Sequence, residues 1–410
     1  MQTCVGLSGD AVAYLLDGIK VIDLASFLAG PGAATLMADY GAEVIKIEPP
    51  GGDGYRRLHG NWEVDYNWQL TSRNKRGMSL DIRSQAGLAV LMKLLEEADV
   101  LVTNFRNDQL ESYGISWSEL HEKFPHLILA QLTGYGNVGP DRHRRGYDST
   151  AFFARGGLME ITRQPNEAPP FPPGGIGDHA TAMTLFAGIM MALYKRDRAG
   201  VGSFVETSLI ATGCWTNGMQ LQGAIAGFDV GRALDKAGAR SPFAMVYTTR
   251  DDRHICLVLT NPKKEFPEVA AALGLAEWAD DDRFTEIRSI MRNRDEVRDK
   301  FREAIGARPL QELCLAFDEM QLTYGVVETL SDVISDAHLV ENEVVVRTES
   351  DNPLFGWTIN NPIRISGEAR KAANNPPEYG QDTRTILEEH GFSSADVEKL
   401  LTDQIVFAAD

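Results

Sequence analysis

Short apolar runs alternate with helical patterns through the first third of the chain, and this alternation restricts the fold more than any other feature. The apolar runs at residues 19–24, 44–48, 100–102 and 127–132 are predicted to be strands. The run at residues 19–24 is predicted to be a buried strand. The order of elements therefore predicts an α/β fold with a doubly wound, mostly parallel, Rossmann-like sheet.

Helical patterns fill the gaps between these runs. Leucines recur at helical intervals through residues 86–98, and the small residues of 33–40 stop at Gly41, a typical helix end. The Gly-Pro-Gly triplet at residues 30–32 is predicted to be a turn between the first strand and its helix.

The regular pattern loosens at residues 223–240, which indicates a passage between two domains. A chain of 410 residues has room for two or three compact units. Residues 1–226 are expected to form the N-terminal part of a large domain, and residues 227–332 a smaller α+β domain. Residues 333–410 are expected to be a linker that returns to the large domain.

The net negative charge of the chain limits which anionic partners it can bind. The chain has 58 acidic and 40 basic residues, a formal net charge of -18. Such a surface repels the phosphates of nucleic acid and of acidic membranes, so neither is an expected partner. Any anionic ligand would have to meet locally concentrated cations.

The chain shows no targeting or metal motif. Residues 1–18 have no basic segment followed by an apolar block, so no secretory signal is expected. The apolar run at 180–194 is too short to cross a bilayer and is predicted to belong to a buried helix over 180–196, before a strand at 204–207. The four cysteines form no CxxC pair, which argues against a zinc site and favours a reducing, cytoplasmic location.

Residues 134–139 match GxGxxG after a predicted strand, so a dinucleotide fingerprint must be considered. The context argues against it. Pro140 and the polar residues 141–145 stand where the fingerprint needs an apolar helix. A glycine loop is the better interpretation.

Asp178 follows a glycine-rich stretch and precedes the expected long helix. Its structural interpretation is a helix N-cap, where a side chain satisfies free backbone amides. Its functional interpretation is a nucleophile, because a helix N-terminus favours an ionised carboxylate and a carboxylate nucleophile must be ionised. Gly177 and its neighbours would let backbone amides approach a developing oxyanion. Both interpretations stay open from these residues alone.

Two cationic runs, at residues 73–76 and 142–145, interrupt the acidic sequence. A solvated charge run is the usual explanation of either one alone. Both lie beside predicted strand ends, where open parallel sheets bind ligands, so a bound phosphate is the competing explanation. His143 and His179 are assigned no role, because single histidines more often only make hydrogen bonds.

Further motifs resemble the class III CoA-transferases (CaiB/BaiF type), which also include formyl-CoA transferase, carnitine CoA-transferase and alpha-methylacyl-CoA racemase. Each motif is short, but their combination is specific, and weaker similarity continues to the C-terminus. The similar segments are residues 18–24, 29–31, 41–49, 74–76, 104–105, 134–136, 146–148, 177–178 and 200–209.

The resemblance implies a CoA-transferase in which Asp178 attacks a donor thioester, forms a mixed anhydride and then carries CoA as an aspartyl thioester. The substrates would be an acyl-CoA and a carboxylic acid, with no permanently bound cofactor and no metal. Leu28, Tyr147 and Gly177 would line the acyl pocket. Six residues would lie along CoA, with the cations near its phosphates: Phe27, Arg73, Lys75, Asn104, Phe105 and Arg145.

Tyr147 bears on the choice of reaction. Racemases of the family carry a histidine at this position, and a tyrosine with a pKa of about 10 is a poor base at neutral pH. Transfer is therefore favoured over alpha-proton exchange by Asp178; a CoA-binding protein without catalysis is a third hypothesis. The segments around residues 146–157 look most like the branch that acts on 2-hydroxy acids. The resemblance also implies an interlocked homodimer.

Overall fold

The computed structural model describes residues 13–58, 63–164, 167–228 and 241–409. These residues form two compact units. Residues up to 160, 170–221 and 340–410 make the larger unit, and residues 161–169 and 222–339 make the smaller one. Part of the expected passage, residues 229–240, and the N-terminal residues 1–12 with Cys4 lie outside the described residues.

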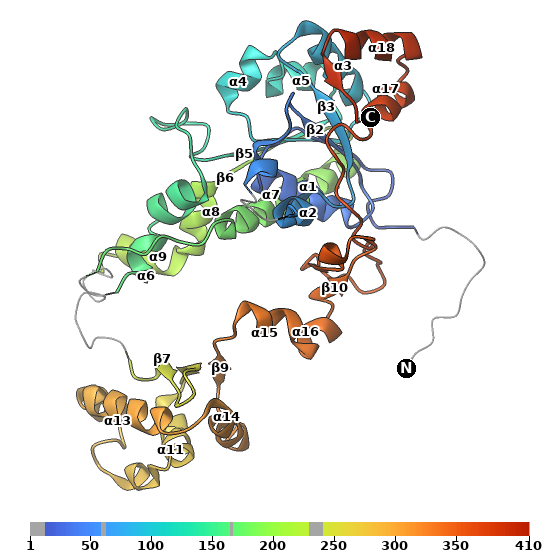
Figure 1. The fold of residues 1–410 in the computed structure, drawn as a ribbon. Coiled ribbons are helices and arrows are strands. Elements are labelled where there is room, and N and C mark those ends of the chain that lie inside the picture. Colours follow the sequence, from blue (N-terminus) through green and yellow to red (C-terminus); the bar gives the residue numbers. More distant parts are fainter. Residues whose placement is uncertain (1–12, 59–62, 165–166, 229–240, 410) are drawn as a thin grey trace. The chain divides into compact units, whose positions relative to one another are not determined.

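A seven-stranded sheet forms the centre of the larger unit (Figure 1). Its strands lie in the order β12-β3-β2-β1-β4-β5-β6, and neighbours are parallel except β12, which runs antiparallel to β3. The strands are β1 Lys20–Asp23, β2 Glu43–Glu48, β3 Arg76–Leu80, β4 Val100–Thr103, β5 Ile128–Thr133, β6 Phe204–Ser208 and β12 Val406–Phe407. The predicted mostly parallel sheet is confirmed. Strand β3 escaped prediction because it follows the cationic run directly and has only two large apolar residues.

Helical layers cover both faces of the sheet, so its central strands are buried on both sides. Successive strand residues serve opposite layers: Val21 belongs to the core beneath α1 and α7, and Ile22 to the core beneath α3 and the C-terminal helices. The helices that build these layers are α1 Ala29–Ala38, α3 Gln85–Leu95, α7 Ile176–Ala199, α17 Thr383–Glu389 and α18 Ser394–Thr402.

Helix α7 is long and apolar enough to span a membrane by length and composition alone. In this fold it is a core helix, because Leu185, Ile189 and Leu193 are buried in the layer that packs on the sheet. The expectation of a buried helix therefore agrees with the structure.

The predicted turn at residues 30–32 is wrong, because these residues form the first turn of α1. Proline is tolerated there, where its missing N–H would have no partner in the helix. The glycines permit close packing: a Cβ on Gly30 would clash with that of Ala25, and one on Gly32 would lie 3.2 Å from Ala182 of α7. The triplet therefore serves helix packing rather than chain reversal.

The remaining elements of the larger unit are short. They are η1 Gly54–Arg57, α2 Tyr66–Ser72, α4 Asn107–Ser112, α5 Trp117–Lys123, the π-helix η2 Asp148–Arg155, α6 Leu158–Thr162, α8 Leu209–Thr216, α9 Gly218–Ile225, β10 Val345–Arg347, η4 Pro353–Phe355 and β11 Trp357–Ile359. Helices α6 and α9 continue into the smaller unit.

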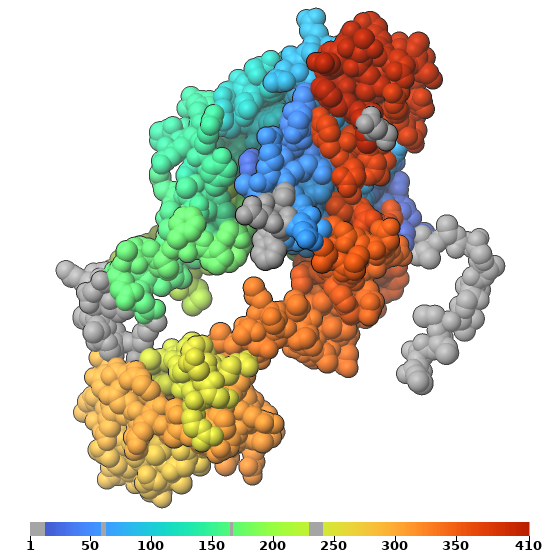
Figure 2. Space-filling view, viewed as in Figure 1, coloured from blue at the N-terminus to red at the C-terminus, as the bar shows by residue number. Residues whose placement is uncertain are grey.

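The C-terminal segment returns to the large sheet, as expected from the tail pattern. Figure 2 shows the red C-terminal residues directly against the blue N-terminal part. Strand β12 extends the sheet beside β3, and the Tyr40 hydroxyl donates to the Ile363 carbonyl at 2.8 Å. Asn361 Nδ2 also donates to the Leu36 carbonyl of α1.

The smaller unit combines a three-stranded antiparallel sheet with helices. Its sheet order is β7-β8-β9, and its core is rich in phenylalanine, including Phe266, Phe301 and Phe317. Its elements are β7 Ala244–Thr248, β8 His254–Val258, α11 Pro262–Ala272, η3 Ala276–Asp280, α12 Ile287–Arg292, α13 Arg294–Gly306, α14 Leu310–Glu319, β9 Tyr324–Val326, α15 Leu330–Ser335 and α16 Ala337–Glu341, which leads into the larger unit.

Candidate active site

Asp178 lies in the first turn of α7, but it does not cap the helix. Gly175 is the N-cap residue, with the left-handed φ of 88° that glycine tolerates best, and Asp178 is the third residue of the helix proper. The helix therefore begins earlier than predicted, and the proposed N-cap role of Asp178 is wrong. Its carboxylate is left available for another purpose.

Asp148 supplies the side chain that α7 needs at its start. Its Oδ1 accepts a hydrogen bond from the backbone N–H of Gly177 at 3.0 Å, across 29 residues of sequence. Gly177 has no room for a larger residue, because an added Cβ would clash with Asp148 Oδ1 and with the Phe152 ring. The identity of Gly177 is thus fixed by packing as well as by its place beside Asp178.

The charge of Asp148 also acts on Asp178. Burial, and secondly the negative charge of Asp148, raise the pKa of Asp178 to about 7. The helix N-terminus was expected to keep Asp178 ionised, and the raised pKa contradicts that expectation. The reason is that Asp148, rather than Asp178, accepts the Gly177 amide, while burial disfavours the second carboxylate. Asp178 is therefore poised between its two charge states near neutral pH.

An apolar wall faces the turn that carries Asp178. Leu28, Tyr55 and Trp68 form a small buried cluster. A Cβ added to Gly175 would lie 3.2 Å from Leu28 Cδ1, so Leu28 packs against that turn. Burial, and then the nearby charge of Asp178, raise the pKa of Tyr55, so its hydroxyl stays protonated and remains a possible donor. The structure thus places Leu28 against Gly175, in the turn that carries Gly177 and Asp178.

Phe27 and Tyr147 form an aromatic pair close to this wall. Their rings meet edge to face with centroids 6.1 Å apart. Both rings remain accessible, at 37% for Phe27 and 56% for Tyr147. Tyr147 directly precedes Asp148 at the start of η2, so the pair lies beside the residues that shape the α7 terminus.

Asn104 and Phe105 follow β4 directly and lie at the carboxyl edge of the sheet. The Asn104 side chain accepts from Ser26 N at 3.0 Å and donates to Ser26 O at 2.9 Å. It therefore joins the loop after β4 to the loop after β1, between which the strand order reverses. Open α/β sheets bind ligands outside such a reversal point. Phe105 is half-buried there against Tyr113, with ring centroids 5.8 Å apart.

Two of the three cations expected at CoA phosphates are already engaged. Arg73 makes a two-pronged ion pair with Asp39 at 2.8 and 3.0 Å and is buried. Lys75 Nζ is fully buried and donates to Asp23 at 2.8 Å, and burial lowers its pKa to about 8 although Asp23 opposes the shift. The structure therefore gives Arg73 and Lys75 internal roles, in place of the expected phosphate contacts. Arg145 is exposed.

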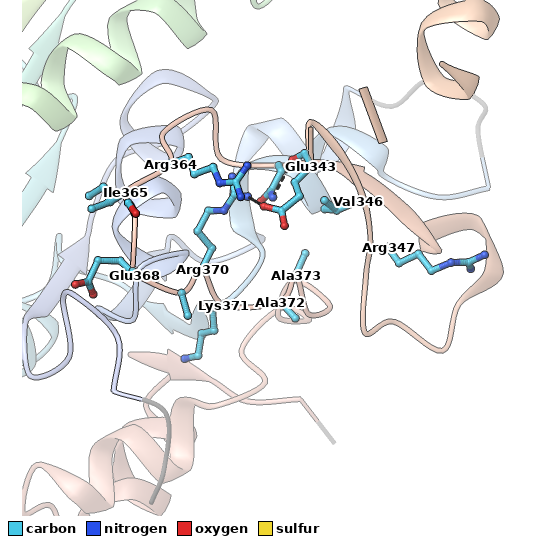
Figure 3. Close-up of a pocket in the computed structure, with 14 residues that line it drawn as sticks. Glu343, Val346, Arg347, Arg364, Ile365, Glu368, Arg370, Lys371, Ala372 and Ala373 are labelled. Carbon is cyan, nitrogen blue, oxygen red and sulfur yellow. Dashed lines mark hydrogen bonds and ion pairs between the residues drawn. The ribbon is translucent and has the colours of Figure 1, made fainter. Parts of the chain in front are cut away.

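A cavity of about 790 Å³ lies elsewhere in the larger unit, between residues 343 and 373. Figure 3 shows Arg364 and Arg370 beside Glu343, with which Arg370 forms an ion pair. None of the predicted site residues lines this cavity. The candidate site is therefore placed on the geometry around Asp178.

Asp148 and Tyr55 are functional candidates that the sequence patterns did not single out. Asp148 stood in a recognised Gly-Tyr-Asp motif, but its contact with Gly177 joins segments 29 residues apart. Tyr55 follows a Pro-Pro-Gly-Gly-Asp turn and has no periodic neighbours. The motif could have indicated Asp148, whereas no sequence signal indicates Tyr55.

The sequence is similar to known CoA-transferases. The sequence model described as CoA-transferase family III matches residues 16–383. The chain is 32% identical to (R)-2-hydroxy-4-methylpentanoate CoA-transferase of Clostridioides difficile, covering 96% of this chain and 99% of that enzyme. It is 30% identical to cinnamoyl-CoA:phenyllactate CoA-transferase of Clostridium sporogenes, covering 95% and 97%.

A solved structure extends the agreement to the fold. The crystal structure of a CaiB/BaiF family protein from Brucella suis superposes with a TM-score of 0.81 at 25% identity, covering 92% of this chain and all of that one. The matched family model spans almost the whole chain, including both compact units. The chain therefore belongs to CoA-transferase family III and is a CoA-transferase.

Proposed function

We propose that this enzyme transfers CoA from an acyl-CoA to a carboxylic acid through covalent intermediates on Asp178. One observation carries the proposal: Asp148 caps α7, so the largely buried carboxylate of Asp178 is free to react. A partly desolvated carboxylate is a stronger nucleophile than one surrounded by water.

The reaction proceeds in four steps that balance. The Asp178 carboxylate attacks the thioester carbonyl carbon, a C–O bond forms, and the C–S bond breaks to release CoA thiolate with its electron pair. The thiolate attacks the aspartyl carbonyl of this anhydride, giving aspartyl-CoA thioester and the free donor acid. The acceptor carboxylate attacks that thioester and displaces thiolate again. Thiolate then attacks the acceptor carbonyl, which forms the new acyl-CoA and regenerates Asp178.

CoA would lie along the carboxyl edge of the sheet in this proposal. Phe27, Asn104 and Phe105 are at or beside that edge, and Arg145 supplies an exposed cation for a phosphate. The acyl group would reach Asp178 past Leu28 and Tyr147. A permanently bound cofactor has no part in these steps.

The acids are proposed to be 2-hydroxy acids or related organic acids with apolar side chains. The two relatives named above act on 2-hydroxy-4-methylpentanoate and phenyllactate, according to their names. The wall of Leu28, Tyr55 and Trp68, with Phe27 close to it, suits such side chains because it is apolar and aromatic.

A screen of acyl-CoA donors against carboxylic acids by mass spectrometry tests this proposal. Formation of a new acyl-CoA with branched or aromatic 2-hydroxy acids is expected. Transfer confined to short unsubstituted acids or to dicarboxylates would contradict the proposed substrate class.

Alpha-proton exchange by Asp178 remains a second candidate, because a pKa of about 7 also suits a general acid–base at neutral pH. Tyr147 argues against a two-base version, since its position holds a phenol rather than an imidazole. Incorporation of solvent deuterium at the alpha carbon of an acyl-CoA, with no acceptor acid present, would favour exchange.

We also propose that the enzyme is a homodimer. Trp215 and Met219, on α8 and α9, are each 86% exposed, although such residues are usually shielded from water. A second copy of the chain would bury them.

A further inference from the structure

Asp53 joins two of the chain segments that form the apolar wall of the site: the loop after β1 and η1. It precedes η1, and its Oδ1 accepts hydrogen bonds from two backbone amides: Tyr55 N at 3.0 Å and Phe27 N at 3.2 Å. The charge of Asp178 acts on Tyr55, and the Phe27 ring pairs with that of Tyr147. One carboxylate oxygen therefore sets the spacing of both segments.

A buried lysine balances this carboxylate. Lys46 Nζ lies 3.1 Å from Asp53 Oδ2 and donates to the Ala25 carbonyl, and both charged side chains are fully buried. Asp23 and Lys75 form the neighbouring pair, at 2.8 Å, so two cations and two carboxylates share this interior. Because an unpaired buried charge is strongly unfavourable, these groups hold one another in place.

Hydrogen bonds fix the backbone of three successive residues in the loop after β1. Ala25 N donates to Asp23 Oδ1 at 3.2 Å, Ser26 is held at both backbone groups by Asn104, and Phe27 N is held by Asp53. Phe27 adopts a φ of 65°, a left-handed conformation that is uncommon for an aromatic residue. Such a conformation persists only where the surroundings impose it, and it clusters at functional sites.

We propose that Asp53 is a positioning residue of the CoA-transferase, which fixes Phe27 and Tyr55 and thereby sets the size of acid that the site accepts. The inference rests on the proposed location of the acyl pocket beside Asp178. Asp53 does not touch the reacting atoms. It acts through the two amides that it holds.

Two readouts on one set of variants test the role of Asp53. In Asp53→Ala, hydrogen exchange at the amides of Phe27 and Tyr55 should accelerate by about tenfold, because their acceptor is lost. The ratio of kcat/KM for a bulky acid to that for a small acid, taken from the two best acids in the screen, should change by about three- to tenfold. Asp53→Asn keeps the acceptor oxygen and should restore both values most of the way.

The matched control is Asp382→Ala, which removes a carboxylate that accepts Gly77 N at 2.8 Å beside β3. Asp382→Ala should lower stability. It should leave unchanged the ratio of kcat/KM for the bulky acid to that for the small acid, and the hydrogen exchange at the Phe27 amide. A general loss of folded enzyme lowers kcat/KM for all acids equally and does not move the ratio. If Asp53→Ala does not fold because Lys46 is left unpaired, the double variant Asp53→Ala/Lys46→Met replaces it, and the same two changes are required.

Wild-type exchange rates at Phe27 and Tyr55 in a folded variant that lacks the acceptor oxygen of residue 53 would overturn the inference, as would an unchanged ratio of kcat/KM for the bulky acid to that for the small acid. If the wild-type enzyme transferred CoA to none of the acids, the proposed substrate class would fail. The exchange measurement would still decide whether Asp53 holds the wall.

Discussion

Asp178 and Asp148 share one helix terminus, and their competition sets the ionisation of the proposed nucleophile. Because the pKa of Asp178 is raised to about 7 and attack needs the carboxylate, kcat/KM should rise with pH through neutrality and level off above about pH 8. Initial rates over a pH series at low acyl-CoA check this. A rate that is flat across neutrality would mean that Asp178 is already fully ionised.

Removing the neighbouring charge should shift that profile. In Asp148→Asn the midpoint of the pH profile should move to lower pH, because the negative charge that opposes ionisation of Asp178 is gone. The plateau rate should fall as well, since the cap on Gly177 is altered. Tyr147→Phe, adjacent in sequence and uncharged, is the control and should keep the wild-type midpoint. A midpoint in Asp148→Asn equal to or above the wild-type value would contradict this account.

Ionisation of Asp178 should also lower the free energy of unfolding at alkaline pH. Its folded pKa is raised, so the folded chain keeps a proton that the unfolded chain loses above about pH 4. Stability is therefore lost as pH rises from about 4 to about 7. Asp178→Asn should exceed wild type by roughly 1–3 kcal/mol at pH 8, with the gap closing near pH 4. Urea unfolding at both pH values measures this, and a wild type as stable as the variant at pH 8 would refute it.

Some residue assignments could be made from the sequence, and others could not because the interacting residues lie far apart in the chain. Gly177 and Asp178 could be singled out because they lie in a recognisable motif, and Leu28 packs against the same turn in the structure. Arg73 and Lys75 were expected at phosphates because a basic run in an acidic chain suggests an anion. Their actual carboxylate partners lie 34 and 52 residues away, and no local pattern reports such pairings.

The start of α7 depends on a glycine that tolerates no side chain. Gly177→Ala would force a clash with Asp148 Oδ1 and Phe152, and should cost about 1–3 kcal/mol and most of the activity. Gly174→Ala is the matched control, because a Cβ there meets nothing within 4 Å. Thermal unfolding and transfer rates of both variants check the prediction. Equal behaviour of the two would show that the α7 terminus is not tightly packed.

Elements were predictable where both faces of a strand are buried. Short runs rich in apolar residues revealed β1, β2, β4 and β5, because a parallel sheet covered by helices buries most of each strand. Helix starts were not predictable to the residue. The start of α1 includes glycines that favour a turn in isolation, and only the close approach of Ala25 and Ala182 explains their place in a helix.

The whole molecule is proposed to act as a dimer. Light scattering should give about twice the chain mass of 45.1 kDa. Introducing charge by the double substitution Trp215→Glu and Met219→Glu should shift the enzyme toward monomer, because these exposed side chains would no longer suit an apolar interface. Leu58→Glu, at another exposed apolar residue of the same unit, is the control for surface charge. A wild-type enzyme that is monomeric at micromolar concentration would refute the proposal.

Asp178 is proposed to carry the acyl and CoA groups covalently. The most direct measurement is mass spectrometry of the peptide that contains Asp178 after turnover with acyl-CoA and hydroxylamine. A hydroxamate on Asp178 is expected with acyl-CoA and not without it, and Asp178→Ala should show neither hydroxamate nor transfer. Transfer by Asp178→Ala at the wild-type rate, or a hydroxamate on another carboxylate such as Asp148, would contradict the claim.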